Sequence, residues 1–414
     1  MADRVIIHAD INNCYASIEM LHYPRLKGHL VAVGGNAELR HGIILAKNYE
    51  AKAYGIQVGM ALWQAKQRCP DLIILPPDYD KYLRFSRLFR GIMAEYSDQI
   101  EPFGLDESWA DLTASSKIYG SGEGIANTIR ERTKSELGVS VSIGVSFNKI
   151  FAKLGSDIRK PDATTVITED NYRDVVWPLP AAELLGVGRS TQARFRYYGV
   201  NTIGDIANTP PETLRRWFGK WGLFLYTYAN GLDNSTVKSI DYEAAVKSVG
   251  NSSTCPRDLE NDDDAHIVFL NLAESVAERM RDLGVMARTV QISLRSNDLE
   301  WIERQAPLPA PSMIATELTD TAMKLLRAHY AWEKPLRGIG IRGTNLVPIG
   351  GVRQMSVFDT ERKRQAMERL EYAIDDIRRR YGYFSIGRAL LRADAKLGRL
   401  DAKSDNVIHP VGYL

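Results

Sequence analysis

A mostly apolar run at residues 5–9 leads directly into Asp10, and this junction constrains the fold more than any other feature of the sequence. A short apolar run of this kind predicts a buried strand, because both faces of such a strand must be covered. The charge that ends the run then lies at the C-terminal tip of the strand. We therefore expect a sheet that delivers a carboxylate to its edge near the start of the chain.

The elements predicted after this strand define the sheet around it. Helices are expected at residues 82–96 and 124–137, and the segment at 101–112 carries turn and strand signals. Residues 139–145 alternate in the way that a strand does. Strand, helix, strand pair, helix and strand in this order predict a ferredoxin-like sheet.

The rest of the chain predicts further domains. At 414 residues it is too long for one ordinary hydrophobic core, and this length favours about two to four domains. Short helices punctuated by glycine start near residue 169, and the polar stretch at 233–246 predicts a linker. A small α/β domain is expected after it, with helices between strands at 247–251, 290–294 and 336–344.

Composition is typical of a soluble globular protein, with 44% hydrophobic and 25% charged residues and no apolar run long enough to cross a membrane. An acidic residue close to the N-terminus argues against a signal peptide. The three cysteines lie far apart, which argues against a disulfide framework or a zinc site and favours the reducing cytoplasm. The net charge of +2 neither predicts nor excludes binding to nucleic acid.

Asp10, Asp106 and Glu107 are the candidate catalytic residues. Each lies at a strand tip or tight turn beside apolar sequence, where a charge costs free energy. Three carboxylates brought together would repel one another unless a divalent cation neutralised them, and Mg²⁺ prefers such oxygen ligands. Two ions bridged by such a cluster are the usual solution for phosphoryl displacement. The alternative is that Asp10 caps a strand and that the Asp-Glu pair is a solvated turn.

Four segments resemble the Y family of translesion DNA polymerases, bacterial DNA polymerase IV and its relatives. They are residues 8–19, 48–52, 104–108 and 142–153, and the resemblance extends over residues 4–347. It implies an α+β right-hand polymerase with a ferredoxin-like palm, small fingers, a helical thumb and an α/β little finger. The implied domains are a palm at 1–12 and 80–168, fingers at 13–79, a helix-hairpin-helix thumb at 169–237, a linker at 238–246, a little finger at 247–347 and a C-terminal tail at 348–414.

The resemblance also implies roles for the acidic residues. Asp10, Asp106 and Glu107 correspond to the catalytic carboxylates of the family, and the backbone carbonyl of Ile11 corresponds to a further metal ligand. The implied cofactor is a pair of Mg²⁺ ions, with Mn²⁺ as the alternative. Many relatives carry another acid where this chain has Asn12, so this position is not expected to be needed for metal binding, although it could tune the site.

Four residues correspond to nucleotide-binding residues of the family. Tyr15 matches an aromatic gate that leaves no room for a ribose 2′-hydroxyl, and Tyr49, Lys52 and Lys160 match contacts to the triphosphate. Relatives usually carry Arg in place of Lys52 and a hydroxyl residue in place of Ala46, so we expect the triphosphate contacts to be distributed differently here. A core tyrosine and solvated lysines are the alternatives.

Two regions are expected to hold DNA without reading its sequence. Gly186 and Gly188 lie in a segment that resembles a helix-hairpin-helix turn, where the backbone approaches a phosphate. Arg295, Arg342 and Thr344 lie on the polar face of two predicted strands, and relatives lay the matching sheet along DNA phosphates. The alternatives are an ordinary helix end and a solvated sheet face.

The C-terminal tail carries two predicted interaction segments. One resembles the peptide by which bacterial polymerases bind the sliding clamp, and its contact residues are Gln354, Met355, Val357 and Phe358. The other lies within residues 361–400, which hold 11 Lys or Arg against 6 Asp or Glu. There a helix is predicted with an apolar stripe of Met367, Leu370, Ile374, Ile377 and Tyr381. We expect this helix to dock by its stripe, with binding to DNA or a partner as the alternative.

Together these features predict a template-directed, low-fidelity DNA polymerase that extends a primer 3′-end in translesion synthesis and DNA repair. Its expected partners are primer-template DNA, deoxynucleoside triphosphates and the sliding clamp, and it is expected to act as a monomer away from membranes. A catalytically silent repair scaffold and a nucleotide cyclase are the alternatives. The three intact carboxylates argue against the scaffold, and the DNA-binding segments argue against the cyclase.

Overall fold

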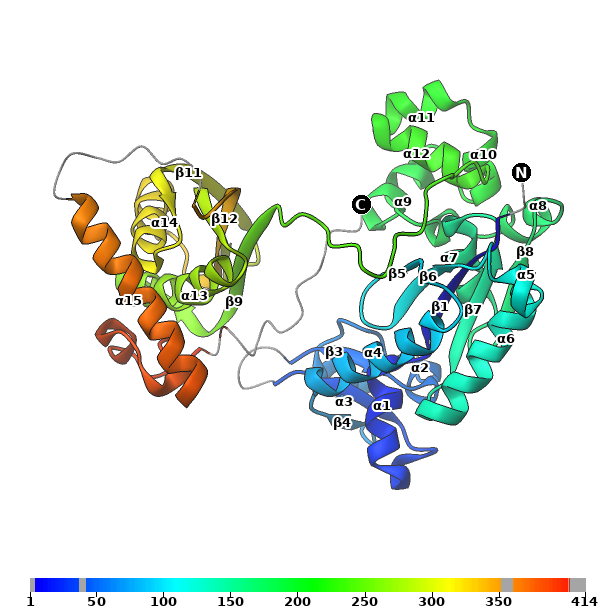
Figure 1. Ribbon diagram of the computed structural model, residues 1–414, viewed down its shortest axis with the longest axis horizontal. Helices are drawn as coiled ribbons and strands as arrows, with labels where there is room; N and C mark the ends of the chain where they lie inside the picture. The colour runs from blue at the N-terminus through cyan, green and yellow to red at the C-terminus, as the bar shows by residue number, and fades with distance from the viewer. Residues whose placement is uncertain (1–3, 37–41, 351–359, 401, 403–414) are drawn as a thin grey trace. The chain divides into compact units, whose positions relative to one another are not determined.

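The computed structural model describes residues 4–36, 42–350, 360–400 and 402. These residues fall into two compact units, which are both visible in Figure 1. Of the described residues, 4–35 and 43–243 form the first unit, and 244–350, 360–400 and 402, together with 36 and 42, form the second. Within this part of the chain, no helix is both long enough and apolar enough to span a membrane.

The first unit is built on a five-stranded sheet with β1 (Ile6–Ile11) at its centre. All six residues of β1 are buried, as expected for a strand that is covered on both faces. β1 runs antiparallel to both of its neighbours, β6 and β7, whereas β8 lies parallel to β7 at one edge. The other strands are β5 (Ile100–Pro102), β6 (Glu107–Asp111), β7 (Val141–Ser146) and β8 (Thr164–Ile167).

Alternation along β1 decides what each face of this sheet carries. The odd-numbered residues from Ile7 to Ile11 belong to a core shared with helices α4 and α6. The even-numbered residues, which end at Asp10, face the side on which helix α7 lies. The helices are α1 (Cys14–His22), α4 (Tyr79–Ala94), α5 (Ser116–Tyr119), α6 (Gly122–Arg132), which a π-helical turn extends over Thr133–Leu137, and α7 (Lys149–Ile158).

A smaller, three-stranded sheet follows β1 in the chain. β2 (Val31–Gly34) lies between β3 (Ile44–Lys47), which is antiparallel to it, and β4 (Ile73–Leu75), which is parallel to it. The short helices α2 (Tyr49–Ala53) and α3 (Leu62–Arg68) share a small apolar core with this sheet.

A group of helices without a sheet completes the first unit. They are α8 (Tyr172–Val176), α9 (Arg189–Tyr197), α10 (Ile203–Asn208), α11 (Pro211–Phe218) and α12 (Lys220–Ala229), and they share one core. The chain then returns to the five-stranded sheet. Val237 is buried against that sheet, and the N–H of Ile240 donates to the carbonyl of Asp98 at 2.9 Å. The first residues of the predicted linker are therefore attached to the first unit.

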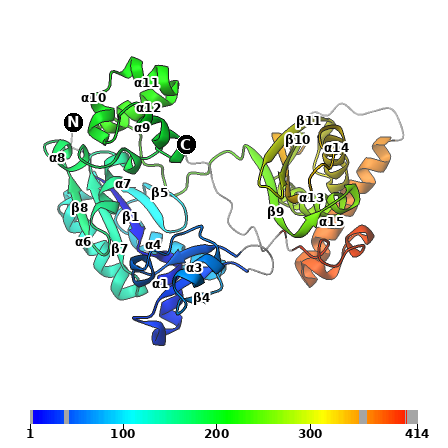
Figure 2. The same ribbon diagram turned by 180° about the vertical axis from the view of Figure 1, so that it is seen from behind.

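The second unit contains a four-stranded antiparallel sheet in the order β11-β10-β12-β9. Its strands are β9 (Ser248–Leu259), β10 (Val285–Ser296), β11 (Trp301–Ser312) and β12 (Leu336–Pro348). Helices α13 (Asp262–Asp282) and α14 (Ala315–His329) share one apolar core with this sheet, and Figure 2 shows them from behind.

β11 is not among the strands predicted from the sequence, because Pro307, Pro309 and Pro311 interrupt it. It lies at the edge of the sheet, and its neighbour is β10. Proline lacks an N–H, and an edge strand tolerates this because the outer N–H groups have no partner strand. The position of the strand in the sheet therefore explains why its sequence does not resemble that of a central strand.

Helix α15 (Thr360–Tyr381) packs on the second unit in a way that differs from the prediction. Leu370 and Tyr381, two members of the predicted apolar stripe, are 45% and 74% exposed. The buried face carries Ile374 together with Glu371 and Asp375, and both acids pair with arginine. The predicted stripe is therefore wrong at two positions, because ion pairs form much of the docking face.

Candidate active site

The strand register brings the three predicted carboxylates to one edge of the five-stranded sheet. Asp10 at the end of β1 lies directly opposite Glu107 at the start of β6. Cross-strand partners point to the same face, so both side chains lie on the α7 side. The N–H of Ile11 donates to the carbonyl of Asp106 at 2.9 Å, which fixes the turn before β6 against the tip of β1.

Two lysines neutralise these carboxylates. Nζ of Lys160 lies 2.7 Å from Oδ2 of Asp10, and Nζ of Lys153 lies 2.6 Å from Oε2 of Glu107 and 3.8 Å from Oδ2 of Asp10. Asp157 lies on the far side of both lysines and contacts each of them. Lys160 is a predicted site residue, whereas no role is predicted for Lys153, although it closes the fingerprint segment at residues 142–153.

Burial dominates the electrostatics of the carboxylates. It raises the pKa of Asp10, and Lys160 opposes this effect. It also raises the pKa of Asp106, to which the charge of Glu107 adds. For Glu107 burial acts in the same direction, but His8 and Lys153 outweigh it and lower the pKa. Positive charge beside these groups therefore favours their ionised forms.

His8 is a site residue for which the sequence predicts no role. Its ring is fully buried, and Nδ1 lies 2.8 Å from Oγ of Ser156 on α7. Nε2 lies 3.2 Å from Oε2 of Glu107, and this contact contributes to the lowered pKa of Glu107. Burial lowers the pKa of His8 to about 4, so the neutral imidazole is favoured. A histidine inside an otherwise apolar strand is the sequence signal that marks it.

The donor atoms at this edge have the chemistry that a divalent cation requires. Carboxylate oxygens and a backbone carbonyl are hard ligands, and Mg²⁺ binds such oxygens. In the described parts of the chain, however, no three His, Cys, Asp or Glu side chains lie close enough together to hold a metal ion. The ammonium groups of Lys153 and Lys160 supply the positive charge beside Asp10 and Glu107 in this arrangement.

Tyr15 lies one residue into α1, directly after the turn that follows β1. Its ring stacks on that of Tyr82 with centroids 4.1 Å apart and 7° between the planes, and the ring of Tyr79 meets it edge-on. Tyr82 is itself fixed, because its hydroxyl donates to Oε1 of the buried Glu19 at 2.9 Å. The packing therefore holds the Tyr15 ring in one position.

Tyr49 and Lys52 lie on α2 beside the small sheet. The side chain of Asn48 caps this helix by accepting from the N–H of Ala51 at 3.0 Å. The hydroxyl of Tyr49 donates to Oδ1 of Asn12 at 3.3 Å, and Nζ of Lys52 lies 5.7 Å from the centre of the Tyr49 ring. Tyr49 therefore contacts the turn that follows β1, whereas Lys52 is exposed to solvent.

Gly186 and Gly188 lie before helix α9 and differ in their surroundings. Gly186 has a φ of 89°, and a Cβ there would come within 2.3 Å of the ring of Trp221. Gly188 is the N-cap of α9, and a Cβ there would meet nothing within 4 Å. Packing against Trp221 explains the first glycine, and open space at the second leaves room for a ligand beside the backbone.

Arg295, Arg342 and Thr344 share the outer face of the sheet in the second unit. Arg342 lies opposite Gln291 on β10, and Thr344 lies opposite Thr289. Cross-strand partners point to the same face of a sheet, and Arg295, four residues after Gln291 on β10, points to that face as well. Arg295 lies over the ring of Trp301, with Cζ 5.3 Å from its centre. The predicted clamp peptide, Gln354 to Phe358, lies outside the described residues.

Comparison with known proteins places the chain in a family. Models of the impB/mucB/samB family and of its C-terminal domain match residues 9–157 and 246–357, and a model described as the DNA polymerase-iota thumb domain matches residues 182–233. DNA polymerase IV of Acetivibrio thermocellus is 47% identical over 96% of this chain and 100% of its own length. DNA polymerase IV 1 of Bacillus subtilis is 36% identical over 97% of this chain and 95% of its own length.

A solved structure supports the fold. A Y-family DNA polymerase chimera matches with a TM-score of 0.72 over 83% of this chain and 99% of its own, at 23% sequence identity. That identity is too low to carry more than the fold. The two family models, which cover more than half of the sequence, and the relatives matched over nearly their whole length carry the assignment. The chain therefore belongs to the impB/mucB/samB family of Y-family DNA polymerases, alongside DNA polymerase IV.

Proposed function

We propose that this chain is a template-directed, low-fidelity DNA polymerase that extends a primer 3′-end in translesion synthesis and DNA repair. The observation that carries the proposal is the register that sets Asp10 opposite Glu107, with Asp106 tied to the strand tip through Ile11. Membership in a family whose curated relatives are named DNA polymerase IV supports the choice of reaction. The proposed reaction is attack of the primer 3′-hydroxyl on the α-phosphate of a deoxynucleoside triphosphate.

We assign the divalent metal to the edge of the five-stranded sheet. Asp10, Asp106, Glu107 and the carbonyl of Ile11 would hold it, as two Mg²⁺ ions with Mn²⁺ as the alternative. When bound, such ions activate the 3′-hydroxyl and neutralise the charge that develops on the phosphates. The burial that raises the pKa of Asp10 and Asp106 supports this assignment, because a buried carboxylate gains most from an adjacent cation.

The nucleotide-binding residues have distinct tasks in this proposal. The ring of Tyr15, held by its stack on Tyr82, closes the space beside C2′ of the sugar and selects deoxynucleotides. Tyr49, Lys52 and Lys160 bind the triphosphate. Lys160 already lies beside Asp10, so its charge is close to the proposed metal position before a nucleotide arrives. Because Lys52 offers a point charge and not a two-pronged guanidinium, its contact is expected to be less directional.

DNA and clamp contacts complete the proposal. The backbone at Gly186 and Gly188 and the start of α9 would bind a phosphate of the duplex, and Arg295, Arg342 and Thr344 would lie along its backbone. The open space beside Gly188 and the shared outer face of the three sheet residues support these roles. Clamp binding through Gln354, Met355, Val357 and Phe358 rests on the sequence alone, as do a monomeric state and a cytoplasmic location.

Primer extension by the purified chain, with Mg²⁺ and all four deoxynucleotides, tests the function. We expect slow, distributive extension that Asp106→Ala abolishes. Glu136→Gln is the matched control, because this exposed carboxylate pairs with Arg132 and its loss should leave extension unchanged. DNA binding without extension would favour the scaffold, and cyclisation of a free nucleotide would favour the cyclase.

A further inference from the structure

The side chain of Asn12 is buried and hydrogen-bonded at both ends of its amide, just beyond the tip of β1. It is 2% exposed. Nδ2 donates to Oγ of Ser140 at 3.2 Å, and Oδ1 accepts from Oγ of Ser142 at 2.9 Å. The main chain is held as well, because the N–H of Asn12 donates to the carbonyl of Ser140 at 3.0 Å. An amide fixed at this many points has a single orientation relative to the catalytic sheet.

The same Oδ1 also accepts a hydrogen bond from the hydroxyl of Tyr49 at 3.3 Å. Tyr49 is the first residue of α2, and Asn48 before it attaches that helix to β2 by accepting from the N–H of Val31. Asn12 therefore joins the tip of the catalytic strand to a helix of the small sheet.

Hydrogen bonds and one ion pair place the phenol near the proposed metal site. The Tyr49 hydroxyl is bonded to Asn12, two residues after Asp10, and Nζ of Lys160 lies 2.7 Å from Oδ2 of Asp10. Burial raises the pKa of Tyr49, with a lowering influence from Lys160 and a raising one from Asp10, in agreement with this placement. A triphosphate held by Lys160 would come within reach of it.

We propose that Asn12 is a positioning residue for nucleotide binding, which holds the Tyr49 hydroxyl at the triphosphate site and yields it to a phosphate oxygen when the nucleotide binds. The inference rests on the proposed triphosphate role of Tyr49. A phenol has one proton and donates to one acceptor at a time. Its bond to Asn12 is long for O–H···O, whereas a charged phosphate oxygen accepts a shorter bond that is roughly twice as strong. The exchange therefore favours the nucleotide, but the bond to Asn12 that is given up stabilises only the free protein and lowers the apparent affinity for the nucleotide.

Nucleotide affinity measured in two backgrounds tests this role. Asn12→Ala is expected to lower KM for the incoming nucleotide by about threefold to tenfold, the range of one neutral hydrogen bond that no longer has to be given up, while kcat stays within about twofold. In the Tyr49→Phe background the same substitution should change KM by less than about twofold, because the hydroxyl is already absent. Ser142→Ala is the matched control. It removes the other donor to Oδ1 and leaves the Tyr49 bond in place, so KM should stay within about twofold.

Two results would overturn the inference. An equal change in KM in both backgrounds would mean that Asn12 acts through the general stability of the strand tip. A rise in KM would mean that Asn12 stabilises the nucleotide-bound site and does not give up the hydroxyl. If Asn12→Ala does not fold, Asn12→Ser replaces it, since serine keeps a buried hydroxyl but is too short to reach Tyr49.

A binding measurement separates this inference from the proposed function. Kd for a deoxynucleotide is measured on the chain bound to a primer that ends in a dideoxynucleotide, so that no chemistry is needed. Extension that depends on Asp106, with no coupling between Asn12 and Tyr49 in Kd, would contradict the positioning role alone. Absence of extension would contradict the proposed polymerase, whatever the pattern of Kd.

Discussion

Charge balance at the edge of the five-stranded sheet depends on lysines that α7 and the turn after it supply. The side chain of Lys153 is 15% exposed and lies within 4 Å of both Asp10 and Glu107. Removing one partner of a largely buried ion pair leaves the other partner without compensation, which costs more than the pair itself contributes. Lys153 should therefore matter for stability even where no catalytic role is assigned to it.

We expect Lys153→Met to lower the free energy of unfolding by about 1–3 kcal/mol, because Glu107 loses its nearest cation in a partly buried site. Urea denaturation of the metal-free chain measures this. Lys134→Met is the matched control, since Lys134 pairs with Asp162 but is 54% exposed, and its loss should cost clearly less than that of Lys153. Equal costs for the two variants would show that the buried carboxylates do not depend on Lys153.

Tyr15 offers a second prediction for a single residue. With Tyr15→Ala the stack on Tyr82 is lost and space opens beside the sugar. We expect discrimination against ribonucleotides to fall by roughly tenfold to a hundredfold, as for other sites that exclude a small group by shape. The ratio of kcat/KM for dCTP and CTP measures it. Tyr82→Phe keeps the stacked ring and should leave this ratio unchanged, so a similar fall in that variant would contradict the gate.

At the scale of elements, helix α7 reaches the catalytic edge because it packs unusually close to β7. The contact is made by glycine on both sides. A Cβ at Gly144 on β7 would lie 2.0 Å from the carbonyl oxygen of Ala152, and a Cβ at Gly155 on α7 would lie 2.9 Å from Cα of Gly144. This spacing places Lys153 beside Glu107 and Ser156 beside His8. Backbone proximity therefore decides which side chains the carboxylates meet.

Gly144→Ala is expected to cost about 3 kcal/mol or more, because backbone atoms on α7 cannot move aside as a flexible side chain can. Chemical denaturation measures the cost, and primer extension should fall with it as Lys153 and Ser156 shift. Gly91→Ala is the control. Gly91 lies within α4, and a Cβ there would meet nothing within 4 Å, so alanine should stabilise the chain by about 0.5–1 kcal/mol. A neutral Gly144→Ala would contradict the close packing.

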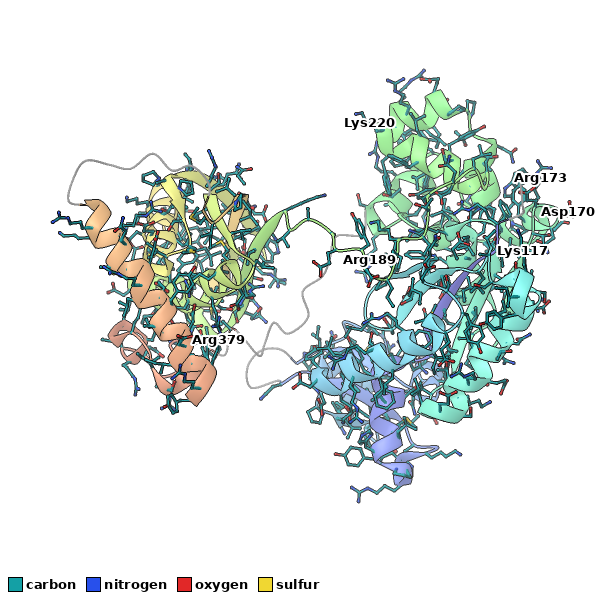
Figure 3. All side chains as sticks on the ribbon, viewed as in Figure 1. Lys117, Asp170, Arg173, Arg189, Lys220 and Arg379 are labelled. Atoms are coloured by element: carbon teal, nitrogen blue, oxygen red, sulfur yellow. The ribbon has the colours of Figure 1, made fainter. Side chains whose placement is uncertain are left out.

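At the scale of the whole molecule, the chain beyond the β9–β12 sheet folds back onto that sheet's own unit. Buried ion pairs join α15 to α13, with Arg281 contacting Glu371 at 3.2 Å and Asp375 at 2.6 Å. Arg378 pairs with Glu274 of α13 at 2.7 Å. Glu371 and Asp375 pair with Arg281 and therefore do not offset the exposed arginines of α15. Much of the positive charge of this helix thus stays at the surface. Arg379, labelled in Figure 3, is 53% exposed on the same helix.

Arg281→Met should release this segment. It leaves Glu371 and Asp375 buried without their shared cation, at a cost of about 3–5 kcal/mol. We expect faster cleavage near Tyr381 by chymotrypsin and a lower free energy of unfolding. Arg379→Met is the matched control, because its pair with Asp282 is half exposed and should contribute less than about 1 kcal/mol. Unchanged proteolysis in Arg281→Met would mean that the remaining contacts, among them the Arg378–Glu274 pair, are enough to hold the segment.

Much of this architecture could be predicted from the sequence, because local pattern carries it. The buried strand that ends at Asp10, the alternating strand before α7 and helices α4, α6, α13 and α14 follow from hydrophobic periodicity. The predictions fail where a contact between distant parts of the sequence overrides the local pattern. β11 contains prolines that only an edge position tolerates, and α15 buries Glu371 and Asp375, which pair with Arg281 and, in the case of Glu371, also with Arg388.

For the site, the sequence determined the carboxylates: three acids at strand tips beside apolar residues, in an order that resembles the Y family. Whether those acids and the nucleotide-binding residues act as proposed remains a prediction. Only the tertiary structure decided that Lys153, His8 and Asn12 join them. Each is brought in by strand register or by the glycine contact between β7 and α7. Periodicity is a local property, whereas a neighbour across strands is fixed by register and packing, which no single segment of the chain contains.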